Sequence, residues 1–293
     1  MKMTDLVSGK MNSFDDTSIY YEIRGEDSET PIIFVYGLAC LMNHWHHQIN
    51  YFSKKFQVVT YDYRGHHASD KPKDPAQLTI EALARDLAHL VHHLDKKKAH
   101  FVGHSFGVPV VMKAFEMFPE VFASMTFING FAKNPIKGMF GVDVVGPFFH
   151  FVKTQFANNP TMWNSLWRTS IDNPISMILS GWAGGFNLKL THFKDIEIYA
   201  RGVANLDLDV FIPLFEDMMN FDGMNILPKI NVPTLIISGE KDMITPVKFQ
   251  QEMHDLIPGS QLMIVPYGSH CTQLDFPEYV NLRLEKFFKE TGL

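Results

Sequence analysis

Six short apolar segments alternate with helical patterns along this chain, and this alternation restricts the possible folds more than any other feature. The segments lie at 31–36, 56–61, 99–104, 124–129, 233–238 and 261–266. Each has the length of a buried strand, and none alternates with the two-residue period of a strand that has one face in water. Buried strands separated by helices are typical of a parallel sheet. The chain is therefore predicted to form an α/β fold with a doubly wound, mostly parallel sheet.

The flanking segments fit this interpretation. Apolar residues at helical spacing predict an amphipathic helix over 79–94, with Thr79 as its N-cap. A second helix is predicted from Pro277 onward, where Asp275 is interpreted as a helix cap. The N-terminal region reads as an antiparallel hairpin that turns at Asp15-Asp16.

The strand pattern stops after the segment at 124–129, which is the sixth predicted strand when the two strands of the hairpin are counted. It resumes about 100 residues later. We predict a helical cap at 131–228, inserted into a core formed by 1–130 and 229–293. Ordinary core helices are the alternative interpretation of this stretch. The insertion is rich in aromatic residues, among them Phe131, Phe140, Phe148, Phe149, Phe151, Phe156, Trp163, Trp167 and Trp182.

Composition excludes several classes of function. The net charge is −6, and the longest basic run is the three lysines at 96–98, so nucleic-acid binding is not expected. No apolar run approaches the roughly 18 residues of a membrane span. The first residues do not resemble a signal peptide, so a cytoplasmic location is expected. Cys40 and Cys271 are accordingly expected to be free thiols.

A serine flanked by glycines follows the third apolar segment. Gly103-His104-Ser105-Phe106-Gly107 lies between a predicted strand and a segment that can be helical. In a nucleophile elbow, this turn is so tight that the flanking side chains must be small, and the serine adopts strained backbone angles. A structural serine turn is the simpler alternative. The position between strand and helix favours Ser105 as a nucleophile.

Serine needs a general base and a group that orients the base. Asp242 follows the strand predicted at 233–238, and His270 follows the strand predicted at 261–266. The order serine, acid, histidine is the one expected for this elbow. Two acids, Glu240 and Asp275, are rivals of Asp242. Asn129 ends another strand but is an amide.

The remaining parts of the site are backbone donors. The N–H of Phe106 and the N–H of Leu38, in the loop beside Gly37, are the expected oxyanion hole. His44, His46 and His47 lie close together in sequence, but no recognisable metal-ligand motif accompanies them. Neither a metal nor a cofactor is therefore expected.

Together these residues resemble the α/β-hydrolase superfamily, in its lidded branch of carboxylesterases, lipase-like enzymes, lactonases, C–C bond hydrolases and cofactor-free haloperoxidases. Residues 62–66 with Ser69-Asp70 are similar to the arginine loop of the family, and 239–242 and 268–270 resemble its acid and histidine loops. The resemblance implies a helical cap and a triad of Ser105, Asp242 and His270.

Three positions depart from the family pattern. Tyr36 stands where the family usually has histidine before the glycine of the oxyanion loop. His67 replaces a glycine of the arginine loop, and Val108 replaces a second glycine after the elbow. All three triad positions are retained.

The expected reaction is hydrolysis of a hydrophobic carboxylic ester or a related carbonyl compound, a small molecule, through an acyl-enzyme on Ser105. A serine nucleophile argues against the chemistry of dehalogenases and epoxide hydrolases. C–C bond hydrolysis, perhydrolysis and a non-enzymatic ligand receptor remain as alternatives. The candidates for lining an apolar pocket are Tyr36, His104, Phe131, Trp163, Trp167 and Trp182.

Overall fold

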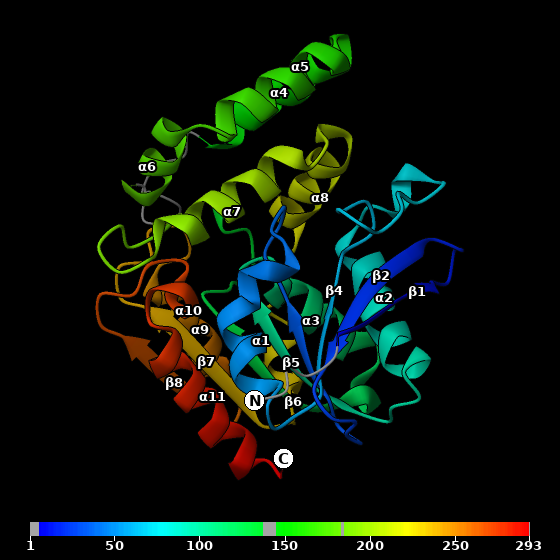
Figure 1. Ribbon diagram of the computed structural model, residues 1–293, viewed down its shortest axis with the longest axis vertical. Coiled ribbons are helices and arrows are strands. Elements are labelled where there is room, and N and C mark those ends of the chain that lie inside the picture. Colours follow the sequence, from blue (N-terminus) through cyan, green and yellow to red (C-terminus); the bar gives the residue numbers. More distant parts are fainter. Residues whose placement is uncertain (1–5, 137–144, 183–184, 293) are drawn as a thin grey trace.

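One eight-stranded sheet organises the chain (Figure 1). The computed structural model describes residues 6–136, 145–182 and 185–292. The strand order is β1-β2-β4-β3-β5-β6-β7-β8. The strands are β1 (Val7–Asn12), β2 (Ser18–Arg24), β3 (Ile32–Val35), β4 (Val58–Tyr61), β5 (Ala99–His104), β6 (Phe122–Ile128), β7 (Thr234–Gly239) and β8 (Gln261–Val265).

The predicted sheet is confirmed. Strands β3 to β8 pair in parallel, and each of the six apolar segments overlaps one of them. The hairpin of β1 and β2 adds the antiparallel edge, with β2 paired to β4. Every residue of β3, β4 and β5 is buried, which explains why these strands show no alternation.

Helices cover both faces of the sheet (Figure 1). Helix α1 (His46–Phe52) contacts α11 (Pro277–Glu290), and α2 (Ile80–His93) contacts α3 (Gly107–Met117). Helix α9 (Val247–Leu256) packs on β7 and β8, and the short α10 (Thr272–Asp275) precedes α11. Thr79 caps α2 as predicted, because its side chain accepts a hydrogen bond from the N–H of Ala82.

Five α-helices of the described residues follow β6 before β7 begins. They are α4 (Val145–Asn158), α5 (Pro160–Ile171), α6 (Pro174–Trp182), α7 (Phe193–Asn205) and α8 (Leu208–Asn220). Helices α4 to α7 lie beyond one end of the sheet (Figure 1). The division into a core and a cap at 131–228 remains a prediction. No helix among the described residues is long and apolar enough to cross a membrane.

A buried ion pair anchors the loop after β4. Arg64 is fully buried and donates to Asp86 of α2 at 2.6 and 2.8 Å, and to Asp15 of the hairpin turn at 2.9 Å. The guanidinium fork thereby joins the loop, α2 and the turn between β1 and β2. Removal of one partner would leave the other charge buried without compensation.

We expect Arg64→Met to lower the free energy of unfolding by about 3–5 kcal/mol, because Asp86 would lose its cationic partner. Arg201 of α7 pairs with Glu197 at the surface, and Arg201→Met is the matched control, with an expected loss below about 1 kcal/mol. Urea denaturation measures both values. Equal losses in the two variants would contradict a special role of the buried pair.

A buried histidine of β5 predicts acid sensitivity. Burial lowers the pKa of His100 to about 4, and its Nδ1 lies 2.7 Å from the Ser124 hydroxyl. The unfolded chain therefore binds a proton near pH 6.5 that the folded chain accepts only near pH 4. Between these values, His100 lowers the stability as the pH falls.

As the pH falls through this interval, the free energy of unfolding should decrease more steeply in the wild type than in His100→Gln. The expected difference between the two slopes is about 1.4 kcal/mol per pH unit. Urea denaturation at about pH 7, 6 and 5 tests this difference. His92, exposed on α2, provides the control, and His92→Gln should keep the slope of the wild type. A His100→Gln slope equal to that of the wild type would contradict the assignment.

Candidate active site

Ser105 occupies the turn between β5 and α3. Its φ is 53°, in the left-handed region that a non-glycine residue adopts only at a cost. Its N–H donates to Ile128 of β6 at 3.0 Å, and its carbonyl accepts from Val108 at 3.0 Å. These bonds hold the strained residue in place, with its hydroxyl partly exposed at the carboxyl end of the sheet.

The glycine after the elbow is required by a close backbone contact. A Cβ on Gly107 would lie 2.4 Å from the carbonyl oxygen of Val35, at the end of β3. No side chain fits at that distance, so α3 approaches β3 this closely only with glycine at its first residue. The tight turn that lifts Ser105 depends on this approach.

The structure brings Ser105, His270 and Asp242 into one hydrogen-bonded chain. Nε2 of His270 lies 2.9 Å from Oγ of Ser105, and Nδ1 lies 2.9 Å from Oδ2 of Asp242. The three residues follow β5, β8 and β7, and both His270 and Asp242 are about 4% exposed. The imidazole therefore joins a hydroxyl to a carboxylate in a largely dry environment.

The carboxylate of Asp242 is held by its own loop. Oδ1 accepts from the N–H groups of Ile244 and Thr245, each at 2.8 Å. Oδ2 accepts from the Thr245 hydroxyl at 2.7 Å, while that hydroxyl also lies 3.2 Å from Nδ1 of His270. These contacts fix the carboxylate with Oδ2 toward the imidazole. Thr245 is not among the site residues predicted from the sequence.

The rival acids have other partners. Glu240 is exposed and accepts from the N–H of Tyr267. Asp275 was interpreted as a helix cap, and this is wrong, because it lies at the end of α10 while Phe276 is the N-cap of α11. Its carboxylate instead accepts from the N–H and hydroxyl of Ser269, both at 2.6 Å, and from the inserted segment at Asn187 and Thr191.

Asn129, the amide at the end of β6, connects the loops of the site. Its Nδ2 donates to the carbonyls of His270 and Ser269 at 2.7 and 3.0 Å, and its Oδ1 accepts from the N–H of Gly239 at 2.7 Å. The residue adopts a φ of 47°. An acid could not donate these bonds, so the amide positions the histidine loop relative to β7.

The two expected oxyanion donors lie on either side of Ser105. Phe106 is the next residue, and a Cβ on Gly37, which precedes Leu38, would lie 3.3 Å from Cβ of Ser105. Within the described residues, the N–H groups of Leu38 and Phe106 have no hydrogen-bond acceptor. They are thus available to an oxygen bound beside Ser105.

The three departures from the family pattern are each accommodated. The hydroxyl of Tyr36 donates to Asp62 at 3.3 Å and accepts from the N–H of Tyr63 at 3.0 Å. His67 keeps the positive φ of a glycine, at 44°, and its Nε2 donates to the Cys40 carbonyl at 2.7 Å. The side chain of Val108 packs against Gly130, and a Cβ on Gly130 would lie only 2.4 Å from Cγ2 of Val108. The absence of a side chain at Gly130 therefore makes room for Val108.

Several of the predicted pocket residues have structural roles instead. Tyr36 is buried in the core. His104 is also buried, and its Nε2 donates to the carbonyl of His270 at 2.9 Å. Burial lowers the pKa of His104 well below its usual value. The His104 ring is therefore neutral when it donates to the backbone of His270.

The aromatic candidates are divided between core and insertion. Phe131 belongs to the main core, whereas Trp163 and Trp167 pack against a cluster formed by Phe149 of α4 and by Leu208 and Ile212 of α8. The side chain of Trp182 and the whole of Phe140 lie outside the described residues.

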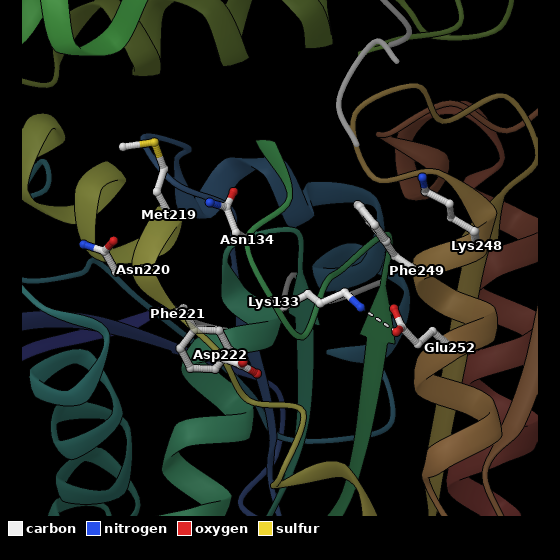
Figure 2. Close-up of a pocket in the computed structure, with 9 residues that line it drawn as sticks. All are labelled: Lys133, Asn134, Met219, Asn220, Phe221, Asp222, Lys248, Phe249 and Glu252. Atoms are coloured by element: carbon white, nitrogen blue, oxygen red, sulfur yellow. Dashed lines mark hydrogen bonds and ion pairs between the residues drawn. The ribbon is translucent and has the colours of Figure 1, made fainter. Parts of the chain in front are cut away.

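A separate cleft of about 740 Å³ lies beside α9 (Figure 2). Lys133, Met219, Phe221, Phe249 and others line it, and two of the lining residues, Lys133 and Glu252, form an ion pair. None of the triad residues lines this cleft. Its size alone therefore does not identify it as the reaction site.

Both cysteines are free and buried, as expected. Burial raises the pKa of the Cys40 thiol to about 12, and that of Cys271 is raised well above its usual value for the same main reason. Both thiols are therefore protonated near neutral pH, and neither is an activated nucleophile.

Comparison with known proteins agrees with the geometry. A sequence model of the alpha/beta hydrolase fold matches residues 30–174, and a model described as TAP-like protein matches 220–292. The chain belongs to the α/β-hydrolase superfamily. The first model contains the elbow and extends through α4 and α5, and the second contains β7 and β8.

Similar proteins include a putative carbamate hydrolase, an esterase and a bromoperoxidase. The putative carbamate hydrolase RutD of Azorhizobium caulinodans is 24% identical over 277 residues, which cover 94% of this chain and 96% of that protein. An esterase from Exiguobacterium antarcticum superposes with a TM-score of 0.74 at 20% identity, covering 96% and 98% of the two chains. A bromoperoxidase from Bacillus anthracis superposes with a TM-score of 0.77 at 19% identity, covering 97% and 100%.

The positions of Asp242 and Glu240 lead to a direct prediction about the serine. We expect Asp242→Asn to slow the labelling of Ser105 by a fluorophosphonate by about 10³–10⁴-fold, because His270 would lose the carboxylate that orients it. Intact-mass spectrometry over time measures the rate. Glu240→Gln, two residues away and exposed, is the matched control and should label like the wild type. Slow labelling of the Glu240 variant instead would transfer the orienting role to that residue.

Proposed function

We propose that this α/β hydrolase is a serine hydrolase that cleaves a hydrophobic carboxylic ester through an acyl-enzyme on Ser105. The observation that carries the proposal is the hydrogen-bonded chain from Ser105 through His270 to Asp242. Nucleophile, base and orienting acid lie at hydrogen-bond distance, which is the geometry that acyl transfer requires.

In the first half of the proposed reaction, Oγ of Ser105 attacks the ester carbonyl while Nε2 of His270 accepts its proton. The negative charge that develops on the carbonyl oxygen is stabilised by the N–H groups of Leu38 and Phe106. His270 then donates the proton to the departing alcohol, and the acyl group remains on Ser105. Asp242 stabilises the imidazolium that exists between these two transfers.

In the second half, water takes the place of the alcohol. His270 removes a proton from the water molecule, whose oxygen attacks the acyl carbonyl, and the same two N–H groups receive the negative charge. The proton returns to Oγ of Ser105 as the carboxylic acid leaves. The bonds from Asn129 and His104 to the His270 carbonyl support the proposal, because they hold the backbone of the base during both steps.

The preference for an apolar ester rests on the composition of the inserted helices. Their exposed or half-buried aromatic residues include Phe148, Phe151 and Phe156 of α4. Apolar walls with few polar groups favour apolar ligands. The names of similar proteins include esterase and carbamate hydrolase, which both denote attack at a carbonyl.

The proposal is tested with short- and medium-chain p-nitrophenyl esters. We expect multiple turnovers by the wild type and a loss of at least about 10⁴-fold in kcat for Ser105→Ala, since the nucleophile would be missing. Ser170→Ala, at an exposed serine of α5, is the control and should retain full activity. Absence of turnover together with absence of a fluorophosphonate adduct at Ser105 would refute an enzymatic function.

The alternatives give different outcomes in the same assay. A ligand receptor would form the adduct without multiple turnovers. A C–C bond hydrolase would prefer vinylogous diketones over esters, and a perhydrolase would require peroxide for its faster reaction. A matched panel of esters, carbamates and diketones ranks these activities by kcat/KM, and the proposal requires the esters to rank first.

A further inference from the structure

Two histidines that follow β3 and an aspartate of the helices between β6 and β7 face one another. His46 and His47 begin α1, and Asp195 lies in the first turn of α7, 148 residues beyond His47. Sequence alone offered only the histidines. We propose that His46, His47 and Asp195 bind a Zn²⁺ ion that clamps α7 onto α1.

The distances fit a tetrahedral ion. Nε2 of His46 lies 3.4 Å from Oδ1 of Asp195, and Nε2 of His47 lies 3.4 Å from Oδ2. Two ligands that each bind zinc at about 2.0–2.1 Å in a tetrahedron are separated by roughly 3.3–3.4 Å. One ligand atom from each of the three residues falls within 4.8 Å of the others, so small side-chain rotations would complete the set.

The hydrogen bonding of His46 argues for a cation in this position. Its Nδ1 lies 3.0 Å from the carbonyl oxygen of Asn43, which can only accept, so Nδ1 carries the hydrogen. In the neutral ring, Nε2 is then a lone pair that faces a carboxylate oxygen. Two acceptors at this distance repel each other unless a proton or a metal ion lies between them.

A proton is the less favourable of these two. The ring centroids of His46 and His47 are 3.9 Å apart, so two imidazolium groups would repel each other strongly. A divalent ion instead interacts favourably with both neutral rings and with the carboxylate.

The surroundings leave room for exchange with solvent. The side chains of His46 and His47 are 25% and 26% exposed, whereas that of Asp195 is 9% exposed. Imidazole and carboxylate ligands suit zinc, and a water molecule would complete the coordination. Such an ion joins α1, which follows the oxyanion loop, to a helix inserted between β6 and β7. This inference does not depend on the proposed esterase activity.

The test uses the full chain after treatment with a chelator. Isothermal titration with ZnCl₂ should show one ion per chain in the wild type. Asp195→Asn and the double variant His46→Gln/His47→Gln should each bind at least about 10-fold more weakly, because they lose ligands. The control is His92→Gln/His93→Gln, at another pair of adjacent, exposed histidines, and it should bind like the wild type. No binding by the wild type, or undiminished binding by the ligand variants, overturns the proposal.

Two further measurements use the wild type alone, so they do not depend on the folding of a variant. Zn²⁺ should slow amide hydrogen exchange in α7, and protection elsewhere without α7 would overturn the clamp. Co²⁺ should give the visible spectrum of a tetrahedral nitrogen and oxygen site. His44, His104 and Cys271 form a second cluster within the described residues. A thiolate-to-metal charge-transfer band would therefore place the ion at Cys271 and overturn the assignment.

Discussion

The geometry of the site depends on the hydrogen bonds of the Asn129 side chain. The candidate triad comes from three loops, which follow β5, β7 and β8, and strands alone do not set the relative position of such loops. Asn129, at the end of the intervening β6, donates to the backbone of the histidine loop and accepts from the first residue of the acid loop. His104 adds a second donor to the carbonyl of His270. The sheet brings the three loops to one edge, and the hydrogen bonds of Asn129 and His104 then fix the distance between the acid loop and the histidine loop.

Much of the fold followed from the sequence, because its signals are local. Buried parallel strands are continuous apolar runs, and the cap of α2 needs only a threonine at the right spacing. Both can therefore be predicted from one short segment of sequence. The elbow was equally legible, since a glycine after the serine is required by the contact with Val35. By contrast, the role of Asp275 was misjudged. Its partners include Asn187 and Thr191, more than 80 residues away, and spacing to the next helix suggested a cap that the backbone does not form. The contacts of Thr245 with His270 and of Asn129 with the histidine loop could not be predicted for the same reason, because these partners are assembled only by the folded sheet.

The departures from the family pattern show how such a site tolerates change. Each unusual side chain has either a hydrogen-bond partner or a neighbouring glycine that leaves room for it. Tyr36 has the Asp62 carboxylate, and burial raises the pKa of both the phenol and this carboxyl, so each group is less acidic than it is in water. Val108 has the space above Gly130, and His67 retains the backbone conformation of the residue it replaces. The loop that contains Leu38 is thus supported by side chains that differ from those of the family pattern. Backbone donors depend on the path of the chain and not on the identity of the side chain.

Asn129 also limits how this site can evolve. An acid at the end of β6 lies within reach of the histidine loop, so a change of one amide to a carboxylate would offer His270 a second orienting partner. That change would exchange a donor for an acceptor opposite the carbonyls of Ser269 and His270, which Nδ2 now satisfies. The two carbonyls and the new carboxylate would repel one another in a buried place. Relocation of the acid from β7 to β6 therefore requires a redesign of the histidine loop at the same time, and the present amide holds the acid at the end of β7.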